Sequence, residues 1–170
     1  MKNVTKFFAL SIVMLAFAAS TFAQPGVSAT ATATATIITP IAISKDVDMN
    51  FGNVAVNASA GTVILAPAST RTVSGGCTLP TPIGTVSAAS FTVTGLAAST
   101  YSITLPVGAT TITAVTNMTV DTWTSTPTPT GTLTAGTSTL TIGATLHVGA
   151  SQAAGVYLSA IPFTVTVNYN

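Results

Sequence analysis

The chain has 170 residues, and only 4 % of them are charged, whereas about 25 % is usual for a soluble domain. Its four basic residues form no patch that could neutralise a phosphate backbone, which argues against nucleic-acid binding. Three acidic residues and a single His leave few groups for acid–base catalysis, so we expect no enzymatic activity.

Residues 1–23 have the layout of a bacterial secretory signal. Lys2 and Lys6 precede an apolar run over 7–18, and small residues lead to a predicted cleavage after Ala23. The apolar run is shorter than the roughly 20 residues that a membrane-spanning helix needs. We therefore expect a secreted chain without a transmembrane segment, in the periplasm, at the cell surface or outside the cell.

Residues 24–38, which we call the arm, are predicted to be an extended strand. Alanine and threonine alternate along the arm, so one face carries only apolar side chains. The members of this face are Val27, Ala29, Ala31, Ala33, Ala35 and Ile37. Eleven extended residues span roughly 35 Å, and side chains this small leave main-chain hydrogen bonds as the main source of affinity, as in strand addition. The pattern leaves open whether the arm is the first strand of its own domain or pairs with a neighbouring copy.

The remaining residues, 39–170, are predicted to form one all-β domain. No stretch shows a sustained period of 3.6 residues, whereas a period of two recurs and Gly and Pro separate the repeats. The alternating segments are 46–51, 91–93, 101–105, 139–148 and 163–169. About a fifth of all residues are Thr, a β-branched residue that suits a pleated surface. These features favour an antiparallel all-β sandwich or barrel.

Three regions carry specific expectations. In the segment 46–51, the apolar side chains should face inward, namely those of Val47, Met49 and Phe51. In the segment 139–148, His147 and the Thr residues should face solvent, and the inward face should comprise Leu140, Ile142, Ala144, Leu146 and Val148. The stretch "TSTPTPTGT" over 124–132 should be an extended surface loop.

No motif for catalysis, a metal or a cofactor is apparent. His147 is the only His, and nothing else supports a Ser-His-Asp triad. The stretch "DVDMN" (46–50) resembles the start of a calcium loop, but Phe51 stands where that loop needs Gly and Asn57 where it needs Glu. Cys77 is the only Cys, so it is either a buried small hydrophobe or a partner for a second molecule. We predict no catalytic, metal-binding or cofactor-binding residues.

Six stretches, taken in order and spacing, resemble a known group of bacterial proteins. They are "IAISKDVDMNFGNVAV" (41–56), "GTV" (61–63), "SFTVTG" (90–95), "YSITLP" (101–106), "LHVGASQAAGVY" (146–157) and "FTVTVNY" (163–169). Together they resemble the group called domain of unknown function 4402. That group is known as secreted and β-rich without an established activity, so the resemblance implies a fold class and a location and no site residues.

A looser resemblance concerns "MNFG" (49–52) and the alternating last segment, which contains Tyr169. Both are similar to chaperone–usher pilus subunits and spore-coat-U-type proteins. In those proteins an immunoglobulin-like sandwich lacks one strand, and the N-terminal extension of the next subunit supplies it. The resemblance implies an antiparallel immunoglobulin-like β-sandwich for 39–170, although the Cys pair of many such subunits is missing here.

Two functions are compatible with these features. The first is a secreted, non-enzymatic structural or surface protein, similar to a fimbrial subunit, that self-associates by strand addition through the arm or an open sheet edge. The second is a monomeric cell-surface module that binds glycans or mediates adhesion. That module would need Trp123 and the three Tyr residues as an exposed platform, whereas core packing is the commoner role of scattered aromatics.

Overall fold

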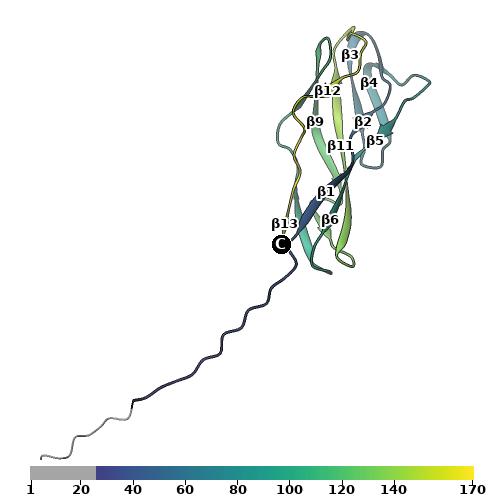
Figure 1. Cartoon of the computed structure of the whole chain (residues 1–170). Coiled ribbons are helices and arrows are strands. Elements are labelled where there is room, and N and C mark those ends of the chain that lie inside the picture. The colour runs from purple at the N-terminus through teal and green to yellow at the C-terminus, as the bar shows by residue number, and fades with distance from the viewer. Residues whose placement is uncertain (1–25) are drawn as a thin grey trace, which may run out of the picture. The chain divides into compact units, whose positions relative to one another are not determined.

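The computed structural model describes residues 26–170 (Figure 1). Contacts divide the chain into two units, Met1–Thr36, of which residues 26–36 are described, and Ile37–Asn170. The predicted signal segment, residues 1–23, lies outside the described residues. Between residues 26 and 170 there is no helix, and thus none that could cross a membrane.

The second unit consists of short strands joined by turns. They are β1 (Ala42–Val47), β2 (Asn50–Phe51), β3 (Ala55–Leu65), β4 (Arg71–Thr78), β5 (Val86–Ser87), β6 (Ala89–Thr94), β7 (Thr100–Thr104), β8 (Thr110–Thr113), β9 (Asn117–Thr126), β10 (Thr130–Thr132), β11 (Thr137–Val148), β12 (Leu158–Ser159) and β13 (Thr166–Tyr169). All pairings between them are antiparallel. This confirms the all-β class and the antiparallel pairing predicted from the two-residue period.

The long strand β11 organises the largest sheet (Figure 1). Along one side β11 pairs with β9, which continues to β8 and β12. Along the other side its first half pairs with β6 and its second half with β3. The strands β1 and β4 lie beyond β6 and β3 respectively. A second sheet has the order β10-β7-β13, and β2 pairs with β5.

Gly143 stands where β11 changes partner from β6 to β3. The last residue paired with β6 is Ile142, and the first residue paired with β3 is Ala144. A Cβ atom at Gly143 would lie 2.2 Å from the carbonyl oxygen of Leu65 and 2.8 Å from the backbone of Ala66. Only a residue without a side chain therefore lets the end of β3 approach β11 this closely.

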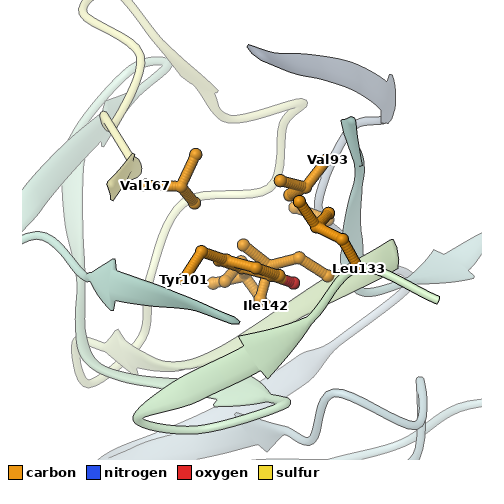
Figure 2. Packing of buried hydrophobic residues seen from close by; sticks show 7 residues of the cluster. Val93, Tyr101, Leu133, Ile142 and Val167 are labelled. Carbon is orange, nitrogen blue, oxygen red and sulfur yellow. The ribbon is translucent and has the colours of Figure 1, made fainter. Parts of the chain in front are cut away.

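One core lies between the large sheet and the three-stranded sheet (Figure 2). Side chains from five different segments point toward one another there, and Figure 2 labels Val93, Tyr101, Leu133, Ile142 and Val167. All of these are fully buried except Val167, which is nearly so. Two facing layers with a shared apolar core make this part of the unit a β-sandwich.

A second core lies along the other half of β11. It contains Val63 from β3, Cys77 from β4 and Val120 from β9, together with Ala144, Leu146 and Val148 of β11. Phe51 of β2 and Val56 at the start of β3 pack against it. The inward face predicted for 139–148 is confirmed, because its five apolar residues are all buried and His147 is exposed. The prediction that the Thr residues of this segment face solvent is wrong for Thr145, which is buried where β3 and β9 flank β11 on both sides.

The prediction that Val47 faces inward is wrong. Its side chain is 45 % exposed, whereas Met49 and Phe51 are half-buried. The pairing of β1 with β6 shifts register between Lys45 and Val47. The bulge interrupts the alternation at Val47, and the predicted inward orientation resumes at Met49 and Phe51.

The prediction of a surface loop over 124–132 is also wrong. The strand β9 continues to Thr126 and β10 begins at Thr130. Ser125, near the end of β9, is buried. The alternating Thr residues are β-branched and suit a pleated ladder. Only the short link around Pro127 and Pro129 remains outside the strands, since Pro lacks the N–H group that a ladder needs.

The last alternating segment, 163–169, is only partly a strand. The strand β13 covers Thr166–Tyr169, which pair with Tyr101–Thr104 of β7. Phe163 and Val165 still face the core and contact it, but residues 163–165 belong to no strand. The partner strand ends because Pro106 follows soon after β7 and cannot donate to a ladder.

We predict that Gly143→Ala destabilises the fold by about 2 kcal/mol or more, because the added methyl group would overlap the backbone at the end of β3. Chemical denaturation followed by circular dichroism measures the change. Gly108→Ala is the matched control, since a Cβ at Gly108 meets nothing within 4 Å. Equal stability of the two variants would contradict the role assigned to Gly143.

Candidate functional site

The arm is the most unusual part of the described chain. Residues 26–40 are assigned to no strand, and every one of them is exposed. Val27 and Ile37, which bound the predicted apolar face, are each 98 % exposed, and Ala29, Ala31, Ala33 and Ala35 between them are exposed as well. The arm therefore offers apolar side chains and free main-chain groups together.

The structure brings His147 and Asp121 together, although they lie 26 residues apart in the sequence. The Nε2 atom of His147 on β11 lies 2.8 Å from Oδ1 of Asp121 on β9. A register shift between β9 and β11 lies beside this pair, and Thr122 within it has a φ of 52° and donates a hydrogen bond of 2.9 Å to Asp121. The extra residue of the bulge directs the carboxylate toward the imidazole ring.

This pair lacks what a catalytic triad requires. The bond to Asp121 is the only hydrogen bond of the His147 side chain within residues 26–170, so no described hydroxyl or thiol donates to or accepts from the imidazole as a nucleophile would. Both side chains are on the surface of the large sheet and are about 40 % exposed. The hydrogen bond from His147, followed by that from Thr122, lowers the pKa of Asp121 below its ordinary value.

The aromatic side chains form no platform. Trp123 packs against Phe163 in a tilted arrangement, with ring centroids 4.5 Å apart and ring planes at 38°, and its Nε1 donates to the carbonyl oxygen of Gly108. Tyr101 is fully buried, Tyr157 and Tyr169 are half-buried, and no aromatic side chain in the described part of the chain is exposed. None of these rings is fully exposed, and each partly exposed one also packs against neighbouring side chains or forms a hydrogen bond.

The other groups named in the sequence analysis are also accounted for. Lys45 and Asp48 form an exposed ion pair of 2.7 Å. Between residues 26 and 170 no three His, Cys, Asp or Glu side chains gather closely enough to hold a metal ion. Cys77 is 4 % exposed, and desolvation by burial raises the pKa of its thiol, which disfavours the reactive thiolate.

A second apolar surface, which we call the β12 patch, was not predicted from the sequence. It consists of Val115 in the β8–β9 turn, Val156, Leu158 in β12 and Ile161, all largely exposed. An open hollow of about 290 Å³ next to it is lined by Thr residues of β8, by Ala109 just before β8, and by Ala160, Ile161 and Pro162 after β12. The sequence feature that could have indicated an apolar surface in this region is the absence of any charged residue from position 122 onward.

We predict that His147→Gln raises the pKa of Asp121 toward its ordinary value, because the larger of the two hydrogen bonds that lower it is weakened. Carboxyl chemical shifts followed by NMR over an acid titration measure this. Thr122→Ala should raise the pKa by less. Since the pKa is lower in the folded chain, the pair stabilises the fold at neutral pH, and this contribution disappears as the pH falls through the folded pKa. An unchanged titration in His147→Gln would contradict the assigned pairing.

Comparison with known proteins adds one finding. No curated protein and no solved structure matches the chain. A family model described as "Domain of unknown function (DUF4402)" matches residues 41–169, which are nearly the whole of the second unit. The match covers most of the chain and includes both cores, the His147–Asp121 pair and the β12 patch, while the arm lies outside it. The chain therefore belongs to the DUF4402 family.

Proposed function

We propose that this protein is a secreted, non-enzymatic structural protein of the bacterial cell surface that assembles into polymers by β-strand addition through its arm. The observation that carries the proposal is the arm itself. It alternates apolar and hydroxylated residues over 27–37, is exposed throughout, and is assigned to no strand. A segment with these properties gains main-chain hydrogen bonds when it joins the edge of a sheet.

The charge distribution supports assembly. Charged side chains on edge strands normally prevent sheets from joining edge to edge. In residues 26–170 there are five charged residues, Lys45, Asp46, Asp48, Arg71 and Asp121, and three of these lie in or beside β1. Most of the remaining surface carries hydroxyl and methyl groups, which repel a second copy very little.

The side-chain chemistry favours a structural role over the two alternatives. The single imidazole is bonded to a carboxylate and contacts no described nucleophile, so it does not resemble a hydrolytic centre. The aromatic side chains are engaged in the core or in hydrogen bonds, as with Trp123 and Tyr169, which leaves a glycan-binding module without its expected platform. Location outside the cytoplasm remains an expectation from the signal-like residues 1–23.

We predict that removal of residues 26–36 abolishes polymer formation, because the strand donor is lost while the unit that begins at Ile37 keeps its core. Light scattering and electron microscopy of the purified protein measure this. A sharper pair of variants is Ala33→Asp and Thr34→Asp. A charge on the apolar face should reduce assembly by about tenfold or more, whereas a charge on the opposite face should have a smaller effect. Polymers that persist without the arm would overturn the proposal.

A further inference from the structure

Two extended segments of the described chain have no main-chain partner. One is the arm together with the residues up to Pro40, which make no main-chain hydrogen bond to another main-chain group. The other is the stretch 160–165, between β12 and β13, which likewise belongs to no ladder and makes no such bond. Buried main-chain groups are nearly always paired in folded proteins, whereas exposed ones can be left to water, so both segments keep main-chain donors and acceptors available to an added strand.

The second of these segments continues directly into an open sheet edge. The strand β13 is the last strand of the order β10-β7-β13, so one side of Thr166–Tyr169 has no strand beside it. Phe163 and Val165 continue the inward alternation of Val167 and Tyr169, and all four contact the first core. The stretch 163–169, which we call the C-terminal edge, therefore has the side-chain pattern of a seven-residue strand, while it is paired over only four residues and on one side.

The other edges of the two larger sheets are less open to a new strand. The edge strand β1 carries Lys45 and Asp46, and β4 carries Arg71, whose guanidinium donates to backbone carbonyl oxygens near β2. The edge strands β10 and β12 have only three and two residues. The C-terminal edge carries no charge, and its outward side chains are the Thr and Asn residues at positions 164, 166 and 168. Charged side chains on edge strands normally prevent another strand from pairing there, so the C-terminal edge is the least protected against such pairing.

The side-chain sizes of the two segments also match. The core behind the C-terminal edge is already closed, because Val93, Tyr101 and Leu133 are fully buried there. A strand added to this edge finds little space to fill between the sheets, which suits an arm whose inward side chains are alanines and would not suit one with bulky residues. Hydroxyl groups on the outward face of the arm would meet those of Thr164 and Thr166.

Resting on the proposed function, we propose that the acceptor of the arm is the C-terminal edge of a second copy, so that the three-stranded sheet gains a fourth strand. Seven residues of the edge span about 23 Å and eleven residues of the arm about 36 Å. The surplus of the arm lies over Ile161 and Leu158 of the β12 patch and covers their exposed side chains. The donor belongs to a second copy, because the proposed polymer requires each arm to join the sheet of a neighbouring molecule.

Disulfide trapping between two different variants tests the pairing directly. Both variants carry Cys77→Ala, so that no native thiol competes. One variant carries Thr30→Cys, Thr32→Cys or Thr34→Cys on the hydroxylated face of the arm, and the other carries Thr164→Cys on the C-terminal edge. The matched control places the second thiol at the exposed Thr72 of the edge strand β4.

We expect at least one arm position to form a mixed dimer with Thr164→Cys about tenfold faster than with Thr72→Cys, since only correctly paired strands hold the two thiols within bonding distance. Equal rates, or a faster reaction at Thr72→Cys, would overturn the assigned edge. A chain that carries both thiols and closes only within itself would overturn the assignment of the donor to a second copy.

A proline substitution gives an independent readout. Val165 makes no main-chain hydrogen bond in the isolated unit, and the register of β13 with β7 directs its N–H away from β7, toward the open edge. Val165→Pro therefore removes a donor that only an added strand would use. We expect it to slow polymer growth by about tenfold or more relative to Val165→Ala, which loses the same core contact and keeps the N–H. Thermal unfolding of the two monomers checks that their stabilities are similar. If Val165→Pro assembles as Val165→Ala does while loss of the arm still abolishes polymers, the edge is wrong and strand addition stands. If polymers form without the arm, the proposed function itself fails.

Discussion

The structure depends on one long strand that pairs with three neighbours. The strand β11 holds β9 along one side and divides the other side between β6 and β3, and the change of partner at Gly143 needs a residue without a side chain. Each half of β11 contributes buried side chains to a different core. The two cores are therefore joined through the backbone of one strand, and a disturbance at Gly143 affects both.

A surface with so few charged side chains offers few side-chain groups for strong polar contacts, so exposed main-chain groups are the main polar groups available for binding. Threonine hydroxyls cover the strands, the aromatic groups are engaged, and the one imidazole is held by a carboxylate. Open main-chain groups then become the strongest binding groups available, because each offers a directional hydrogen bond. The arm and the C-terminal edge are the places where such groups are most abundant in the described chain.

The sequence by itself determined the all-β class and the apolar face of β11, because a period of two places alternate side chains on opposite faces of a strand, although it did not identify the strand residues within 124–132. It therefore predicted the inward face of β11, the exposure of His147 and the pattern of the arm. Only the tertiary structure decided which strands are neighbours, because alternation says nothing about partner or register. The bulge that exposes Val47, the contact between His147 and Asp121 and the open C-terminal edge all arise from pairings between residues far apart in the chain, which no local pattern encodes.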